Sequence, residues 1–252
     1  MATLILEHSD MARADRFGTI LRDQGHRLEV RRLHAGDALP NDLDGIDAVV
    51  SFGGPMEVTA AAEAEHPWMT GELALLRQAH ETDRPVVGIC LGNQLLARAL
   101  GGTVERLGDP GIELGWHDVD LTPAGRDDPI FAGAPWSAVQ LQAHRWHVSE
   151  VPEGAEVLAR SELCPVQVWR SGLRTYGIQY HPESHADRLG QWCDAEPGDV
   201  ADSGQSREKI DADTERHWPA MARINDRLFE RIALLVMPLD RRFAGIAKDI
   251  HH

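Results

Sequence analysis

The stretch Pro85-Val86-Val87-Gly88-Ile89-Cys90-Leu91-Gly92-Asn93-Gln94 decides the fold and also carries the first sign of chemistry. The apolar run 85–89 predicts a buried strand, and leucines at helical spacing over 91–100 predict a helix directly after it. Cys90 lies at the junction, with a glycine two positions away on each side, which is the nucleophile elbow pattern with a thiol in place of a hydroxyl. Larger side chains at Gly88 or Gly92 would collide with neighbouring backbone. The positive end of a helix dipole favours a thiolate, although Cys90 taken alone is also compatible with a small buried structural residue.

Composition indicates a single globular domain over residues 1–252. The chain is 42% hydrophobic and 26% charged, and its formal net charge is -15. So acidic a protein is a poor candidate for binding nucleic acid or an anionic membrane. No apolar run reaches the length of a membrane span, and the first residues lack the basic region of a signal peptide.

The cysteines indicate a reducing compartment. There are three, at positions 90, 164 and 193, and they match neither a disulfide framework nor a metal-binding spacing. We therefore expect a cytoplasmic protein in which Cys164 and Cys193 are reduced structural thiols. The terminal pair His251-His252 is left out of the functional interpretation.

Strands and helices alternate through the first hundred residues. The expected strands are 3–7, 27–33, 47–52 and 85–89, and the expected helices are 11–24, 68–81 and 91–100. This alternation predicts an α/β fold: a flavodoxin-like, mostly parallel central sheet with helices on both faces. Sites in such sheets form beyond the carboxyl ends of the strands. Gly53-Gly54 and Cys90 both follow strand ends, so we expect them to be close in space.

The second half of the sequence shows a different pattern of secondary structure. Strand-like segments at 103–107, 113–121, 138–142, 156–159, 166–170 and 175–180 are separated by turn signals, which predicts antiparallel hairpins. The polar stretch 194–213 is interpreted as partly a mobile loop. Residues 215–236 are expected to form a helix that packs on the sheet through Met221, Ile224, Leu228, Ile232 and Leu235. Residues 185–252 would thus be a C-terminal helical extension, anchored in part by Trp192 and Trp218.

The segment His181-Pro182-Glu183 offers partners for the thiol. Residues i and i+2 of an extended segment share a face, and Pro182 disfavours helix at the residue before it. Glu183 can therefore reach one nitrogen of the His181 ring and leave the other for Cys90, which makes a nucleophile, a base and an orienting acid. Read alone, the same segment could be a strand end followed by a helix cap.

Taken together, Gly-Ile-Cys-Leu-Gly-Asn-Gln at 88–94 and Gln-Tyr-His-Pro-Glu at 179–183 resemble the class I glutamine amidotransferases. The resemblance is to the stand-alone group similar to the amidotransferase domain of GMP synthase. Gly53-Gly54-Pro55, the stretch 113–116 and the stretch 142–145 fit the same group. Residues 144–146 read His-Arg-Trp, where that group often has His-Gly-Asp, so recognition of the glutamyl portion is where this chain departs from the pattern.

The resemblance implies a glutaminase reaction that needs no cofactor and no metal. Cys90 would attack the glutamine side-chain amide, His181 would move the proton, and Glu183 would orient His181. Backbone N–H groups of Gly54 and Leu91 would form the oxyanion hole. Glutamine would be held by Gly53, Gln94, and the backbone around His144 and Arg145. The ammonia would pass to a separate synthetase or other acceptor protein, or be released.

Several alternatives stay open on the sequence. A γ-glutamyl peptidase or hydrolase would use the same thioester on γ-glutamyl amides other than glutamine. His144-x-x-His147 and His181-x-x-x-His185 would suit a zinc hydrolase, although Pro182 opposes one regular helix turn there. A non-enzymatic binding protein that has kept the fold is the third. By resemblance, Glu72 would support the oxyanion loop; otherwise it is a solvated helix carboxylate. The stretch 109–116 is expected at the mouth of the site.

Overall fold

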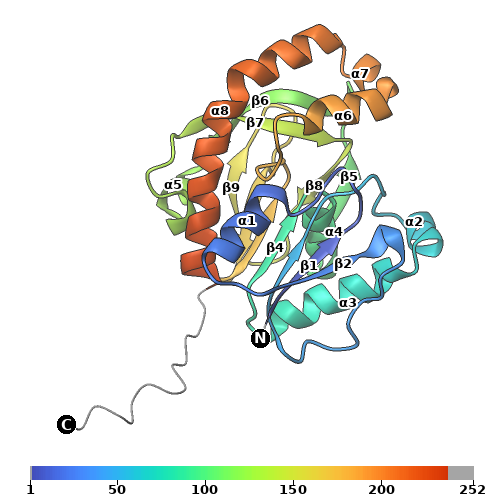
Figure 1. Cartoon of the computed structure of the whole chain (residues 1–252), viewed down its shortest axis with the longest axis vertical. Coiled ribbons are helices and arrows are strands. Elements are labelled where there is room, and N and C mark those ends of the chain that lie inside the picture. The colour runs from blue at the N-terminus through green and yellow to red at the C-terminus, as the bar shows by residue number, and fades with distance from the viewer. Residues whose placement is uncertain (1, 238–252) are drawn as a thin grey trace.

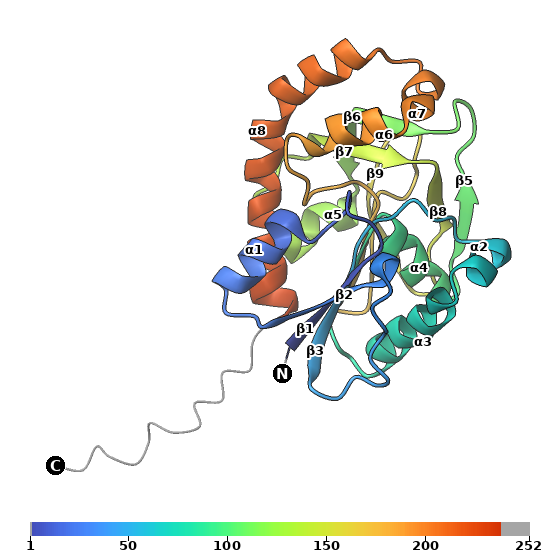
Figure 2. The same ribbon diagram turned by 45° about the vertical axis from the view of Figure 1, so that its right-hand side comes forward.

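The computed structural model describes residues Ala2–Met237, so His251-His252 and the end of the predicted C-terminal extension lie outside the described residues. The protein is an α/β structure. Within Ala2–Met237, nine strands form one twisted sheet, and helices cover both of its faces (Figures 1 and 2). A separate ribbon of two strands lies beside it. No helix among these residues combines the length and the apolar character needed to cross a lipid bilayer.

The elements alternate as expected in the first half and turn into hairpins in the second. The strands are β1 (Ala2–Glu7), β2 (Leu28–Arg32), β3 (Ile46–Ser51), β4 (Val86–Ile89), β5 (Thr103–Arg106), β6 (Glu113–Leu121), β7 (Ser137–His144), β8 (Trp146–Glu150), β9 (Glu156–Arg160), β10 (Val168–Ser171) and β11 (Thr175–Ile178). The helices are α1 (Asp15–Asp23), α2 (Ala60–Glu65), α3 (Trp68–Glu81), α4 (Leu91–Ala99), α5 (Pro123–Asp127), α6 (Arg188–Ala195), α7 (Pro197–Asp202) and α8 (Arg207–Arg231). Shorter turns are η1 (Leu33–Ala35), η2 (Pro129–Phe131) and the π-helical η3 (Ile232–Val236).

The strand order β2-β1-β3-β4-β11-β10-β9-β6-β7 brings the predicted site segments to one edge. Strands β1, β2, β3, β4 and β11 run parallel, with Ser51 paired to Gly88 and Ile178 paired to Ile89. The residues that follow β3, β4 and β11 therefore lie side by side at the carboxyl edge of the sheet. The remaining pairings, from β10 to β7, are antiparallel, as the hairpin signals predict.

Alternation along the central strands fills two cores, one on each face of the sheet. In β1, Ile5 belongs to the core under α1 and α8, whereas Leu4 and Leu6 belong to the core under α3 and α4. Figure 2 shows the sheet between these two helix pairs. Phe17 of α1 stacks on Phe229 of α8, with ring centroids 4.4 Å apart. The long C-terminal helix is thereby joined to the main core.

Three predictions about the second half are wrong in detail. The stretch 194–213, expected to be partly a mobile loop, is mostly helical: it contains the end of α6, all of α7 and the start of α8, because its polar, acidic residues form helices with exposed outer faces. Strand β8 was not expected; it pairs with β5 outside the main sheet. Leu235 is 54% exposed and does not share the buried face of α8, because η3 changes the helical repeat after Arg231.

Candidate active site

Cys90 occupies a strained turn between β4 and α4. Its φ of 53° and ψ of -109° lie in a region that residues other than glycine rarely adopt. A Cβ at Gly88 would lie 2.5 Å from the Gly92 carbonyl oxygen, and a Cβ at Gly92 would lie 2.1 Å from the Ser51 carbonyl oxygen. Both distances are far inside normal contact, so these two positions require glycine. The elbow is thus pressed against the end of β3 and presents the thiol at the start of α4.

His181 and Glu183 form a buried pair just beyond β11. The Nδ1 atom of His181 lies 2.9 Å from Oε1 of Glu183, and the two side chains are 7% and 1% exposed. Burial alone would lower the pKa of His181. The negative charges of Glu183 and Cys90, and the hydrogen bonds to both, outweigh burial and raise the pKa of His181 well above its ordinary value. The ring is therefore suited to accept and keep a proton.

Cys90 and His181 converge above Gly53. A Cβ built on Gly53 would lie 2.9 Å from Cε1 of His181 and 3.4 Å from the Cβ of Cys90, so both side chains crowd the same point. The nearness of Cys90 is one of the causes of the raised pKa of His181. The sulfur also lies 4.0 Å from the carbonyl oxygen of Ala143 at the end of β7. The structure thus brings the predicted nucleophile, base and acid together.

Helices α1 and α8 hold the loop that carries His181. The backbone N–H of His181 donates to the carbonyl of Leu141 at 2.9 Å. The Arg16 guanidinium in α1 donates to the carbonyl of Pro182 at 3.1 Å and also binds Asp226 in α8. The indole N–H of Trp218 in α8 donates to the carbonyl of Ser184 at 3.1 Å. The C-terminal helix therefore fixes the position of this loop in addition to covering the sheet.

The Gly53-Gly54 loop rests on a buried network of Glu72, which the resemblance had suggested, together with His8 and Ser51, which the sequence analysis did not single out. Nε2 of His8 lies 2.7 Å from Oε2 of Glu72, whose other oxygen accepts the Ser51 hydroxyl at 2.6 Å. Nδ1 of His8 lies 3.0 Å from the carbonyl oxygen of Phe52. Burial would lower the pKa of His8, but the charge of Glu72 and these hydrogen bonds raise it. Glu72 is fully buried, so it is not a solvated helix carboxylate.

The two predicted oxyanion donors lie beside one another. A Cβ at Gly54 would be 3.0 Å from the side chain of Leu91, which shows how closely the loop approaches the start of α4. Within Ala2–Met237, no hydrogen bond is formed by the backbone N–H of Gly54 or of Leu91. Both donors therefore remain available to a bound oxygen.

A pocket of about 220 Å³ opens above Cys90. Its inner wall includes Gln94, which is 3% exposed and donates through Nε2 to the carbonyl of Trp146 at 2.8 Å. Helices α6 and α7 form the outer wall through Trp192, Glu196 and Asp199, and Figure 1 shows them across the end of the sheet. None of the lining residues comes from 109–116, so the expectation that this stretch forms the mouth is wrong for the described pocket.

The side chain of Arg145 binds residues of this outer wall. Its Nε donates to Asp199 at 3.0 Å, and its terminal nitrogen reaches Asp202 at 2.7 Å. Trp192 donates to the other oxygen of Asp199 at 2.9 Å. The Arg145 side chain therefore serves to tie α7 to the end of β7, and what remains for a substrate at this position is the backbone.

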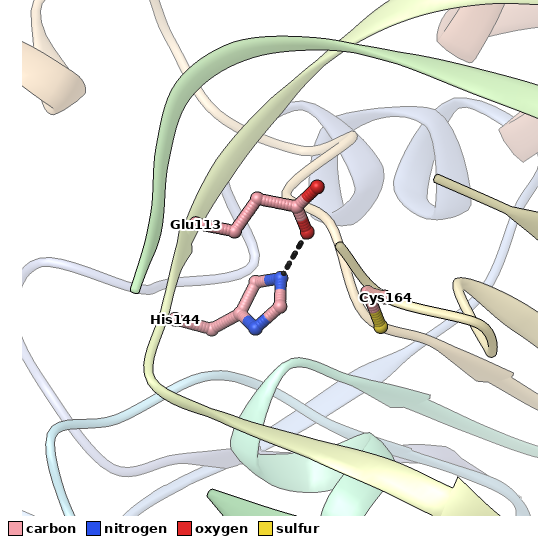
Figure 3. Close-up of side chains that lie close together, drawn as sticks. All are labelled: Glu113, His144 and Cys164. Carbon is pink, nitrogen blue, oxygen red and sulfur yellow. Dashed lines mark hydrogen bonds and ion pairs between the residues drawn. The ribbon is translucent and has the colours of Figure 1, made fainter. Parts of the chain in front are cut away.

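His144 belongs to a buried hydrogen-bonded cluster with Glu113. Figure 3 shows their side chains pointing at each other, with Cys164 beside them and not joined by a dashed line. Nε2 of His144 lies 2.9 Å from Oε2 of Glu113. Glu113 also accepts from Ser161 at 2.6 Å and from Gln167 at 2.8 Å. Burial would raise the pKa of Glu113, but the hydrogen bond and charge of His144 lower it.

The hydrogen bonds of the Glu113–His144 cluster also concern the alternative interpretation of the protein as a zinc hydrolase. Among the described residues, the set of side chains close enough to share a metal ion is Glu113, His144 and Cys164, and neither histidine pair of the sequence pattern forms such a set. The Glu113 oxygens are already taken up by hydrogen-bond donors. The cluster is therefore better suited to positioning His144 than to holding zinc.

Comparison with known proteins gives a consistent result. The family model of class I glutamine amidotransferases matches residues 19–192. The glutamine amidotransferase-like protein YfeJ of Salmonella typhimurium is 39% identical over 168 residues, which cover 64% of this chain and 66% of that protein. A subunit of the glutamine-hydrolysing GMP synthase of Thermococcus kodakarensis is 39% identical over 111 residues, or 44% of this chain and 56% of that protein. The matched stretches thus span about half to two thirds of these relatives.

Solved structures extend the likeness to the whole fold. A crystal structure of a glutamine amidotransferase from Methylobacillus flagellatus has a TM-score of 0.83 and 27% identity, covering 100% of this chain and 98% of that one. A glutamine amidotransferase from Thermotoga maritima shares the fold with a TM-score of 0.80 at 24% identity, over 93% and 98% of the two chains. On the family match, which spans most of the sequence, this chain belongs to the class I glutamine amidotransferase family.

Proposed function

We propose that this protein hydrolyses the side-chain amide of glutamine through a γ-glutamyl thioester on Cys90. The observation that carries the proposal is the convergence of Cys90 and His181 above Gly53, with Glu183 bonded 2.9 Å from the far nitrogen of the ring. Nucleophilic catalysis by cysteine needs this order of groups: a thiol, a base in contact with it, and a group that orients the base.

The reaction would proceed in two steps. Transfer of the Cys90 proton to His181 gives a thiolate–imidazolium pair; the thiolate attacks the amide carbon, and the imidazolium then protonates the departing nitrogen, which leaves as ammonia. Water next attacks the thioester, again with His181 as base, and glutamate leaves as the thiol re-forms. The raised pKa of His181 favours the imidazolium that must protonate the leaving group.

The oxyanion of each tetrahedral intermediate would be held by the backbone N–H groups of Gly54 and Leu91. Preorganised donors of this kind each lower the barrier by roughly 3–4 kcal/mol. Their positions depend on the His8–Glu72–Ser51 network below the loop, which makes His8 and Glu72 positioning residues. Gly53, Gln94 and the backbone at His144 and Arg145 would hold the amino-acid portion of glutamine.

The ammonia would be used by a separate protein. Some relatives are named as one subunit of a glutamine-hydrolysing GMP synthase. By analogy, we propose a separate synthetase as the acceptor, in a cytoplasmic setting.

The outer wall of the pocket favours one second candidate, a γ-glutamyl peptidase or hydrolase. Trp192, Glu196 and Asp199 continue the pocket beyond Cys90, on elements α6 and α7 that are tied down through Arg145. A leaving group larger than ammonia would meet these side chains. The chemistry at Cys90 would be unchanged.

One experiment separates the two. The full-length protein is incubated with glutamine or with a panel of γ-glutamyl dipeptides, and glutamate, ammonia and released amino acid are measured. Turnover of glutamine by wild type, lost in Cys90→Ala and kept in the matched control Cys193→Ala, supports the proposal. Cleavage of the dipeptides alone assigns the second function, and glutamine turnover that persists in Cys90→Ala refutes the thioester mechanism.

A further inference from the structure

A second cavity lies between α8, the β6–β7 hairpin and the loop that follows η2. Its volume is about 240 Å³, and it shares no lining residue with the pocket above Cys90. The walls are mostly apolar and include Val119, Leu121, Ile130, Phe131 and Leu228. For scale, an apolar cavity of about 150 Å³ accommodates a benzene molecule. The space is therefore sufficient for a body larger than a single unsubstituted ring.

One wall of this cavity carries a polar atom with unused bonding capacity. Asn225 of α8 is 1% exposed, and its Nδ2 donates to Oε1 of Gln140 in β7 at 2.8 Å. Its Oδ1 is buried and accepts no hydrogen bond from any of the described residues. Buried carbonyl oxygens in proteins nearly always have a donor, and leaving one without a partner is costly. This oxygen itself has almost no accessible surface, so a bound molecule would pack against Asn225 without bonding to Oδ1.

A second polar group borders the same space. Tyr180 lines the cavity, and no hydrogen bond of its hydroxyl is found among residues 2–237. Burial raises the pKa of this phenol and is the single cause of that shift, so the hydroxyl is neutral and can donate or accept a hydrogen bond. Two polar groups thus border otherwise apolar walls, which is the composition of a small-molecule site.

The rim of the cavity is cationic. Arg227 and Arg231 lie one helical turn apart on α8 and both line the cavity. Neither guanidinium has an acidic partner among the described residues, although the chain as a whole is strongly acidic. A planar guanidinium favours carboxylate and phosphate oxygens. The rim would therefore select an anion.

We propose that this cavity, which we call the α8 cavity, binds a small amphipathic anion. Such a ligand has an apolar body of one or two rings, an N–H or O–H donor that meets the hydroxyl of Tyr180, and a carboxylate or phosphate held by Arg227 and Arg231. The site is separate from the proposed glutaminase chemistry and does not depend on it.

The test uses three aromatic probes that differ by one group each. Indole-3-acetate carries ring, donor and carboxylate; 1-naphthaleneacetate lacks the N–H donor; indole lacks the carboxylate. Binding to the full-length protein is measured by isothermal titration calorimetry. Indole-3-acetate is expected to bind at one site per chain, and each of the other probes about tenfold more weakly, as the loss of one hydrogen bond or charge contact implies.

Variants locate the site. Tyr180→Phe should weaken indole-3-acetate about tenfold while leaving 1-naphthaleneacetate unchanged, because that probe makes no bond to the hydroxyl. Arg231→Gln should weaken both acetates, whereas Arg223→Gln, on the same helix but outside the cavity lining, should weaken neither. Ala138→Phe fills the cavity from β7 and should abolish binding; it keeps the test decisive should Tyr180→Phe fail to fold.

Two results would overturn the proposal. One is the absence of binding of all three probes to wild type at millimolar concentration. The other is binding of indole-3-acetate that survives Ala138→Phe in a variant whose circular dichroism spectrum and melting transition match those of wild type. In that case the probe binds elsewhere on the protein.

Discussion

The Glu183→Gln substitution tests how the acid of the proposed triad works. It replaces the carboxylate that accepts the Nδ1–H of His181 at 2.9 Å with an amide of nearly the same volume. The amide can turn its NH₂ group toward Nδ1, which places the remaining ring proton on the nitrogen that faces Cys90. His181 would then hold the tautomer that cannot accept the thiol proton.

The expected loss follows from two contributions. A hydrogen bond to a charged group contributes about 1.5–3 kcal/mol, which corresponds to roughly tenfold to more than a hundredfold in rate. The wrong tautomer adds to this, and a carboxylate-to-amide change in a serine triad costs about 10⁴ in kcat. We therefore expect kcat for glutamine to fall by about 10² to 10⁴. Because the substitution also removes the charge from a buried ion pair, the melting temperature should fall, and the assay is run well below it.

The assay is steady-state ammonia release as a function of pH, with Glu150→Gln, an exposed carboxylate on β8, as the control. Glu183 is the first of the influences that raise the pKa of His181. The protonated ring is needed to release ammonia, so activity falls as pH rises through that pKa. Without Glu183 the pKa of His181 drops, and the alkaline limb should move to lower pH. An unchanged kcat with an unchanged alkaline limb would refute the assigned role.

Two further predictions concern stability. Gly92→Ala places a Cβ 2.1 Å from the Ser51 carbonyl oxygen, so we expect the free energy of unfolding to fall by about 3 kcal/mol or more and the melting temperature to fall with it. The control Gly198→Ala places a Cβ that meets no atom within 4 Å and should be near neutral. Equal effects of the two substitutions would contradict the elbow geometry. Glu72→Gln breaks a buried pair with His8 and should cost about 3–5 kcal/mol in denaturant unfolding. Because the folded-state pKa of His8 is raised, the stability that the pair contributes is complete below about pH 6.5 and is lost as pH rises through the folded-state pKa. If the stability of the Glu72→Gln variant depended on pH as that of wild type does, the pair would not act in this way.

What could be predicted from the sequence was local. The elbow is visible because an apolar strand, two glycines and a helix follow one another within ten residues of chain. The His181–Glu183 bond is visible because the two residues are two positions apart. In both cases neighbouring residues determine the geometry, so the pattern can be read directly.

What could not be predicted depends on distant partners. His8 was not singled out, because its partner Glu72 is 64 residues away in the chain; Glu72 itself was suggested by resemblance, and no local pattern shows that it is buried. Strand β8 owes its existence to pairing with β5 in a ribbon outside the main sheet. The polar helices α6 and α7 resemble a loop in composition, and their ties to Arg145 appear only in three dimensions.

The proposed chemistry requires a covalent bond between glutamine and one particular sulfur. Wild-type protein mixed with glutamine, quenched in acid within the first turnovers and digested, should yield a peptide containing Cys90 that is heavier by one γ-glutamyl group. The peptides of Cys164 and Cys193, whose thiols are buried and have raised pKa values, should stay unmodified. Rapid glutamate formation with no glutamyl group on Cys90 at any quench time, or with the group on another residue, would contradict the account.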